Sequence, residues 1–264
     1  MKKIITSALI LILYTVTISQ ICANTAFEGK VTEEGTSSYT NRIIDKDTGK
    51  GINGAKITLP KQHYSTKTDQ NGFFELDTYI DGASIMSVQK EHYKPFSVTI
   101  DEQSLSTPLV LSIEKSNTGG IVVDSEMYHL GDNNYSDLSA NAGEFHMSAI
   151  GPAYNKRFIM KNLKFNQPIY LIIGSIIGID TNMARNMGQN HITNAFANPP
   201  EVYFNGNKIA EIQINGDGQR IRVPNSLIKK NQVNELSIKT GRNLMQTAYI
   251  DYDDIEFMNI FFEN

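Results

Sequence analysis

The chain contains almost no cysteine and no tryptophan. Cys22 is the only cysteine among the 264 residues, and tryptophan does not occur. An intrachain disulfide is therefore excluded, and the folded protein must be held together by hydrophobic cores alone. A chain of this length is long enough to form two such cores.

Motifs that carry catalysis are also missing. The sequence has no G-x-S-x-G elbow, no H-E-x-x-H pair, no P-loop and no dinucleotide-binding glycine pattern. The five histidines are scattered, and the nearest grouping, Glu144 and His146 with His129 upstream, lacks the spacing of a zinc site. We assign no catalytic residue and predict a protein that is not an enzyme, with a hydrolase as the less favoured alternative.

Positive charge is in the minority. The chain has 24 Lys and Arg against 28 Asp and Glu, for a formal net charge of −4. Such a surface disfavours nucleic acid and anionic lipid as partners. After the N-terminus no apolar run is long enough to span a membrane, because residues 168–179 are short and are interrupted by Gly174 and Gly178.

The N-terminus has the pattern of a secretory signal peptide. Lys2 and Lys3 precede a mostly apolar run over residues 4–18, and Ala23 offers a small residue for cleavage. Residues 1–23 are therefore predicted to direct export to the periplasm, the cell surface or the extracellular space. Cys22 leaves a lipoprotein as an alternative, although Ile21 stands where a small residue is expected.

The remaining sequence predicts an all-β protein with two antiparallel β-sandwich domains. A polar leader covers residues 24–38, a first domain residues 39–114, a small-residue linker residues 115–120 and a second domain residues 121–264. Short alternating segments separated by turn residues indicate the strands, and no segment has the helical period except a possible turn after Pro224. The strands are expected near residues 40–44, 55–59, 72–77, 85–90, 96–100, 109–112, 143–148, 156–163, 169–173, 201–204, 208–214, 220–223, 234–239 and 255–262. A hairpin turn is expected at Asn205-Gly206, because Asn-Gly accepts the positive φ values of a type I′ turn, and another turn is expected at residues 214–218.

Residues 39–114 resemble the carboxypeptidase-regulatory-like family, which has a transthyretin-type, prealbumin-like sandwich. Its run of turns and strands is matched by Asp45, Thr48, Gly49, Gly54, Ala55, Thr68, Asp69, Gly72 and Phe74. His92 stands where that family usually has glycine. The resemblance implies a scaffold and does not imply peptidase activity.

Residues 121–264 resemble a galactose-binding-like jelly roll of the kind found in carbohydrate-binding modules. The likeness lies in four ordered pieces, at residues 129–135, 202–209, 223–238 and 253–260. It implies a two-sheet sandwich, a possible structural calcium ion, and a ligand site on loops or on a sheet face. The absence of tryptophan departs from many members, which stack a sugar ring on that side chain.

Two sets of candidate site residues follow. Carboxylates before the last strand and near the domain start could hold calcium: Glu126, Asp251, Asp253 and Asp254. A solvated acidic turn explains the same pattern. Loop side chains that can stack on a sugar or bond its hydroxyls are His129, Asp132, Asn134, Tyr135, Arg185, Asn186, His191 and Tyr252.

The sequence thus predicts an exported binding protein that recognises a glycan or a cell-surface polysaccharide through its second domain, with the first domain as a spacer. One alternative is a structural or adhesion protein that contacts other surface proteins. Another is an accessory module of a secreted glycoside hydrolase system.

Overall fold

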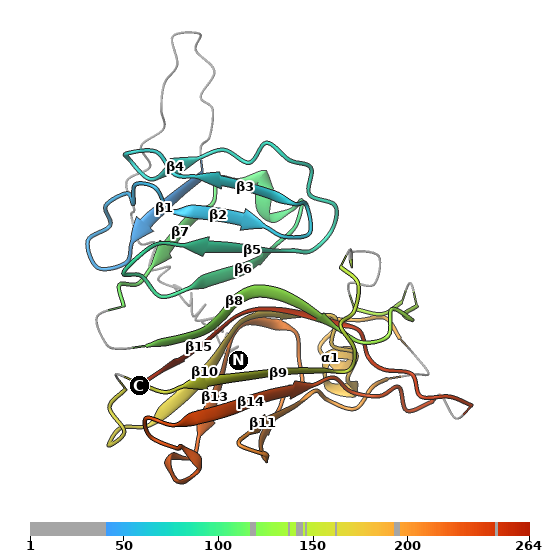
Figure 1. Ribbon diagram of the computed structural model, residues 1–264. Helices are drawn as coiled ribbons and strands as arrows, with labels where there is room; N and C mark the ends of the chain where they lie inside the picture. Colours follow the sequence, from blue (N-terminus) through green and yellow to red (C-terminus); the bar gives the residue numbers. More distant parts are fainter. Residues whose placement is uncertain are drawn as a thin grey trace, which may run out of the picture. The chain divides into compact units, whose positions relative to one another are not determined.

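The computed structural model describes residues 41–264 except 117–119, 137, 141–144, 146, 162, 193–195 and 246–247. The predicted signal peptide and polar leader lie outside the described residues, as do Glu144, His146 and the middle of the predicted linker. Residues 39–264 form one compact unit. The fold is mostly β, and its sheets pack in pairs as sandwiches (Figure 1).

The first sandwich is formed by two small sheets, in the strand orders β4-β1-β7 and β3-β2-β5-β6. Alternation of side chains along the strands places Ile43, Ile57 and Val88 in a common core. The strands are β1 (Asn41–Asp45), β2 (Lys56–Leu59), β3 (Tyr64–Lys67), β4 (Phe73–Phe74), β5 (Ser84–Gln89), β6 (Phe96–Ile100) and β7 (Val110–Ile113), and the 3-10 turn η1 (Ser104–Ser106) precedes β7.

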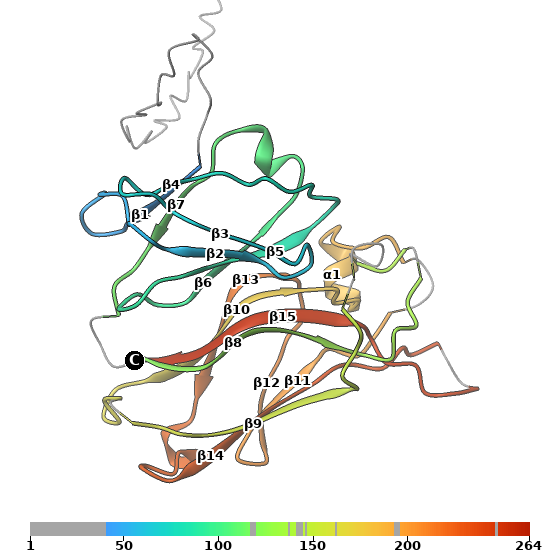
Figure 2. The ribbon, with the colours of Figure 1, turned by 45° about the horizontal axis from the view of Figure 1, so that its top comes forward.

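The second sandwich is larger, with the strand orders β13-β10-β15-β8 and β12-β11-β14-β9 (Figure 2). Its core includes Phe204, Phe257 and Phe262, all with no exposed surface. The elements are β8 (Ile121–Leu130), β9 (Ala153–Ile159), β10 (Ile169–Ile177), α1 (Asn182–Asn186), β11 (Glu201–Phe204), β12 (Asn207–Glu211), β13 (Gly216–Val223), η3 (Asn225–Leu227), β14 (Val233–Lys239) and β15 (Ile255–Glu263).

Turn chemistry explains several boundaries. Asn205 and Gly206 both have positive φ, 48° and 80°, and join β11 to β12 as the Asn-Gly pair predicts. The buried carboxylate of Asp45 accepts hydrogen bonds from the backbone N–H and the hydroxyl of Thr48, both at 2.8 Å. This side chain closes the turn after β1.

The structure also differs from the sequence-based expectations. The strand β7 pairs with β1 in parallel, so the first sandwich is not wholly antiparallel. The strands β3 and β8 and the helix α1 were not predicted. The strand β13 begins at Gly216, inside the turn predicted at residues 214–218. Half of the strand predicted at residues 143–148 falls outside the described residues, and its described members belong to no strand.

The two sandwiches pack against each other through the β2-β3-β5-β6 sheet and the β8-β10-β13-β15 sheet. Ile85 joins Met127 and Met258 in a small apolar cluster between them. The Ser175 hydroxyl donates to Ser97 Oγ at 3.0 Å, inside this buried layer. The first sandwich is therefore fixed to the second by buried contacts.

Further hydrogen bonds, one buried and one exposed, also link the two sandwiches. Asn259 Nδ2 donates to Ser87 Oγ at 3.1 Å, and the backbone N–H of Thr99 donates to the Asp217 carboxylate at 3.1 Å. No helix within the described residues has the length and apolar character needed to cross a membrane.

Candidate functional site

A pocket of about 330 Å³ opens at the end of the second sandwich. Its wall comes from the loop after β8, the segments that flank α1, and the segment before β15. Four carboxylates from these segments line it, and all four are buried: Asp180, Asp251, Asp253 and Asp254. The chain thus places several acidic groups around one small volume.

The pairing of β8 with β15 determines where the loops meet. Leu130, the last residue of β8, lies opposite Ile255, the first residue of β15. Gly131, which follows β8, and Asp254, which precedes β15, are therefore neighbours. Gly131 has φ +145°, and a Cβ built on it would lie 2.3 Å from Oδ1 of Asp254. Glycine is required here because the Asp254 carboxylate occupies the space of a side chain.

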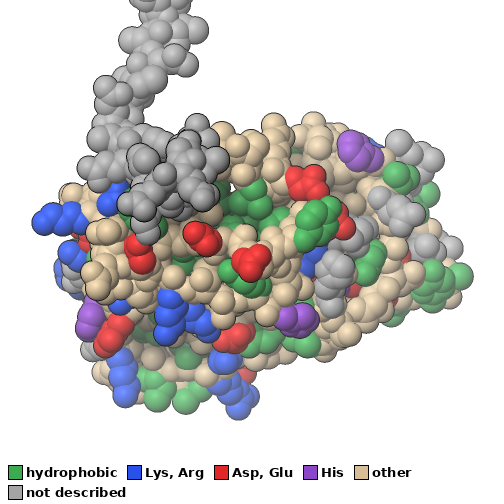
Figure 3. Space-filling model, turned by 90° about the horizontal axis from the view of Figure 1, so that it is seen from above, with side chains coloured by type: hydrophobic (Ala, Val, Ile, Leu, Met, Phe, Trp, Pro, Cys, Tyr) green, Lys and Arg blue, Asp and Glu red, His purple; other side chains and the backbone are tan. Residues whose placement is uncertain are grey.

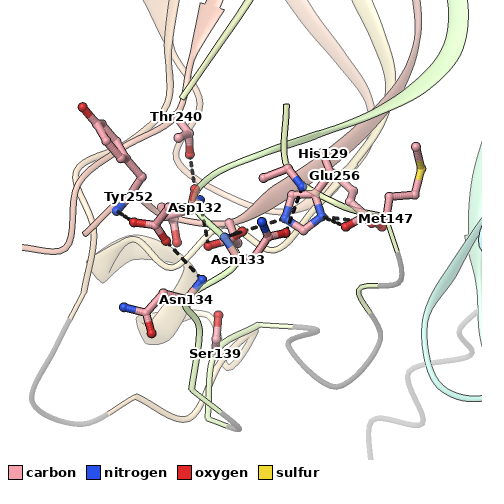
Figure 4. Close-up of polar contacts among 12 residues, drawn as sticks. His129, Asp132, Asn133, Asn134, Ser139, Met147, Thr240, Tyr252 and Glu256 are labelled. Atoms are coloured by element: carbon pink, nitrogen blue, oxygen red, sulfur yellow. Dashed lines mark hydrogen bonds and ion pairs between the residues drawn. The ribbon is translucent and has the colours of Figure 1, made fainter. Parts of the chain in front are cut away.

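The carboxylate of Asp254 is held by the loop and by a buried imidazole. It accepts a hydrogen bond from the backbone N–H of Asn133 at 2.9 Å. His129 Nε2 lies 2.7 Å from Asp254 Oδ1, and His129 Nδ1 lies 2.7 Å from the Met147 carbonyl and 3.5 Å from Glu256 Oε1 (Figure 4).

Burial by itself opposes a charged imidazole. The hydrogen bond with Asp254 and the negative charge of nearby Glu256 outweigh it and raise the pKa of His129 to about 9. His129 is then a cation at neutral pH and compensates the two buried carboxylates. It lies beneath the pocket, has no exposed surface, and positions Asp254 from behind.

Asp132 and Asn134 connect the β8 loop to the segment before β15. The Asp132 carboxylate accepts the backbone N–H of Tyr252 and that of Asn134, both at 3.1 Å (Figure 4). Asn134 Nδ2 donates to Asp251 Oδ1 at 2.8 Å. These contacts fix the mouth of the pocket from both sides.

A second pair of carboxylates lies deeper. The backbone N–H of Asp180 donates to Asp253 Oδ2 at 3.2 Å, and the Asp180 carboxylate accepts the Ala140 N–H at 2.7 Å and the Ser139 hydroxyl. Burial raises the pKa of Asp180. Burial and the neighbouring Asp180 raise the pKa of Asp253 well above its ordinary range. The pair therefore retains protons more readily than exposed aspartates do.

The carboxyl group of Asp251 at the mouth is shifted in the same direction, since burial, and then the negative charge of Asp132, raise its pKa. Carboxylate oxygens accept hydrogen bonds, and the side-chain amides of Asn134 and Asn243 in the same lining can donate them. The pocket therefore offers both kinds of partner to a polar ligand.

Aromatic side chains line the same pocket. Tyr135 and Tyr249 are 38% and 55% exposed, so their rings are accessible to a ligand. Tyr252 and Phe196 are the other aromatic residues of the lining. Each ring lies beside an arginine, and for Tyr252 this is Arg242, whose guanidinium lies 5.7 Å from the ring centre. A flat ring beside buried polar groups is a surface on which a sugar can stack.

The structure brings together only part of the predicted ligand set. Asn134, Tyr135 and Tyr252 line the pocket, and Asp132 supports it through hydrogen bonds. The other members are not among its lining residues. Arg185 lies 5.4 Å from the centre of the Phe196 ring, Asn186 is exposed at the end of α1, and the backbone of exposed His191 donates to the Leu138 carbonyl.

Several lining residues were not assigned to the site from the sequence, chiefly Asp180, Ser139 and Asn243. Asp180 follows a buried apolar strand, and a carboxylate directly after such a strand was an available signal. Ser139 and Asn243 lie in irregular segments, and no pattern in the sequence distinguishes them from solvated loop residues.

The residues predicted to hold calcium are divided. Asp251, Asp253 and Asp254 line the pocket, whereas Glu126 is exposed on β8 and is not part of its lining. Within the part of the chain that the structure describes, no group of three or more His, Cys, Asp or Glu side chains is arranged to hold a metal ion.

Comparison with known proteins assigns no family to the chain. No protein-family model matches the chain, and a search of curated proteins finds no significant match.

Proposed function

We propose that this is an exported, non-catalytic binding protein that recognises carbohydrate in the pocket at the end of the second sandwich. The observation that carries the proposal is the combination, in one pocket, of accessible tyrosine rings with buried carboxyl groups and with more exposed amide and hydroxyl groups. Sugars present an apolar C–H face and a ring of hydroxyls, and these two kinds of group match them.

The hydrogen bonds at the mouth make the pocket suitable for binding. Asn134 is held by Asp251, and the segment that carries Tyr252 is held by Asp132. Groups fixed before the ligand arrives lose little conformational entropy on binding. The resemblance of residues 121–264 to galactose-binding-like jelly rolls, and of residues 39–114 to carboxypeptidase-regulatory-like sandwiches, agrees with a modular exported binder.

The test is a glycan array followed by calorimetry on the best ligand. Tyr249→Ala and Asn134→Ala should each weaken binding by roughly tenfold, since stacking and a polar contact are each worth about 1 kcal/mol or more. Tyr79→Ala is the matched control, because Tyr79 is 75% exposed in the first sandwich and lies outside the pocket. An array without any bound glycan, or equal losses in the control, would contradict the proposal.

Export has its own test. Expression of the full chain in a bacterium with a signal peptidase, followed by mass spectrometry of the exported protein, should give a mature N-terminus at Asn24. Retention of the full chain in the cytoplasm would contradict export.

A second candidate is a surface-assembly protein that contacts other proteins through a sheet edge. The observation in its favour is the exposed cross-strand pair Ile159 and Val233, 41% and 52% exposed, on the edge strand β9 and its neighbour β14. Light scattering that shows specific self-association, lost in Ile159→Lys, would favour this candidate.

A further inference from the structure

A second pocket lies beside the packed layer of the two sandwiches and shares no lining residue with the first. Its volume is about 460 Å³, and three of its lining residues are lysines: Lys56, Lys67 and Lys90. The net charge of the chain is negative, and on the face drawn in Figure 3 Lys and Arg side chains are interspersed with Asp and Glu, so this grouping of three lysines is a local feature.

Strand register places two of these lysines directly against each other. Lys56 of β2 lies opposite Lys67 of β3, and on its other side it lies opposite Gln89 of β5. Residues paired in this way point to the same face of the sheet, so the two ammonium groups share one surface. Directly opposed like charges destabilise a sheet.

The third lysine approaches from the next loop. Lys90 Nζ lies 3.5 Å from the position of a Cβ built on Gly54, so the ammonium group lies over a residue without a side chain. Among the ion pairs formed by the described residues, none includes Lys56, Lys67 or Lys90. Glu91 also lines the pocket, and its carboxylate lies 3.5 Å from His92 Nε2.

The rest of the wall is fixed and only partly polar. The Tyr93 hydroxyl donates to Asp45 Oδ2 at 2.7 Å, which orients the ring. Val122 of β8 is 53% exposed and lines the same pocket, as does Ser125. A ring, an exposed aliphatic surface, an amide and a hydroxyl beside three cations suit a sugar that carries negative charge.

From this geometry we infer that the pocket between β2, β3 and β8 binds an anionic polysaccharide, through carboxylate or sulfate groups held by Lys56, Lys67 and Lys90. The opposed lysines are retained at a cost to stability because a bound anion compensates them. This site is separate from the acidic pocket, with which it shares no lining residue.

The test uses the full mature chain and three soluble polymers as probes in calorimetry at low salt. Polygalacturonate carries carboxylates, dextran sulfate carries sulfates, and polyglutamate carries carboxylates on a peptide. The variant K56Q/K67Q/K90Q is compared with K50Q/K161Q/K229Q, which removes the same charge from exposed lysines elsewhere.

The first variant should lower the affinity for at least one polysaccharide by about tenfold or more, and the control by less than about twofold, since each ion pair contributes modestly. The first variant should also unfold at the same or a higher temperature than the wild type, because repulsion is removed. Equal losses in both variants, no binding of either polysaccharide, or equally lysine-dependent binding of polyglutamate would each overturn the inference.

Discussion

The imidazole Nε2 of His129 lies 2.7 Å from Oδ1 of Asp254, and neither side chain has any exposed surface. The pair joins the end of β8 to the start of β15, directly under the acidic pocket. The geometry of the pocket wall therefore depends on a buried charge that does not itself line the pocket.

Replacement of His129 should be strongly destabilising. His129→Gln leaves Asp254 and Glu256 buried without their cation, and breaking one side of a buried pair costs about 3–5 kcal/mol. Urea denaturation should show this loss. His191→Gln is the control, because His191 is exposed, and it should change the unfolding free energy by less than about 0.5 kcal/mol. If the unfolding free energy of His129→Gln is close to that of the wild type, the burial of Asp254 and Glu256 does not depend on a positively charged His129.

Stability should fall at alkaline pH for the same reason. The pKa of His129 is raised from an ordinary 6.5 to about 9, so the folded state holds this proton more tightly than the unfolded state. The contribution is fully present below pH 6.5 and is lost as the pH rises through about 9. Thermal unfolding from pH 6 to 10 should show this decline in the wild type, and a flatter profile in His129→Gln. Parallel profiles would contradict the assignment.

Asp253 should act in the opposite sense to an ordinary stabilising carboxylate. Burial and Asp180 raise its pKa in the folded state, so its ionisation opposes folding as the pH rises above the ordinary range of aspartate. Asp253→Asn removes that ionisation and should stabilise the protein by roughly 1 kcal/mol at pH 8, with little change at pH 4. Asp77→Asn, at an exposed position, should have no such pH-dependent effect. If Asp253→Asn lowers the melting temperature at pH 8, burial and the neighbouring Asp180 do not make the ionised carboxylate unfavourable in the folded state.

Much of the sheet content could be predicted from the sequence because alternation and turn residues are local signals. The strand Phe96–Ile100 and the strand Glu201–Phe204 have the predicted bounds, and the Asn205-Gly206 turn is confirmed. The strand Ile121–Leu130 was missed because both of its faces are partly covered, one by the second core and one by the first sandwich. Its alternation is therefore weak.

The candidate site was predictable only where a motif carried it. Asn134, Tyr135 and the aspartates before β15 stand in recognisable turns, and the structure places them around one pocket. Asp180 comes from a different loop, and its approach to Asp253 depends on the packing of β10 beside β15. The basic pocket has the same origin, since Lys56 and Lys67 become neighbours only through the register of β2 and β3.

Gly131 should not tolerate a side chain. A methyl group there would lie 2.3 Å from the Asp254 carboxylate, in a backbone conformation with φ +145°. Gly131→Ala should therefore cost roughly 2 kcal/mol or more and weaken ligand binding. Gly151→Ala separates the steric clash from the backbone strain, since Gly151 has φ +110° but no atom lies within 4 Å of an added Cβ. It should show the smaller backbone cost alone, about 1 kcal/mol. Equal costs in the two variants would remove the steric argument.

Gly174 tests whether the two sandwiches unfold together. A Cβ on Gly174 would lie 2.4 Å from Ser97 Oγ of the first sandwich and 2.8 Å from Asn259 Cβ. Gly174→Ala should therefore force the sandwiches apart locally, lower the unfolding free energy by roughly 1–3 kcal/mol and broaden or split the calorimetric transition. Ser97→Ala removes the nearer contact but not the farther one, so the double variant should recover part of the loss. If Gly174→Ala shows one sharp transition at the wild-type temperature, the layer between the two sandwiches accommodates the methyl group without loss of stability. Full additivity of the two substitutions would mean that Ser97 is not the group against which the new methyl is pressed.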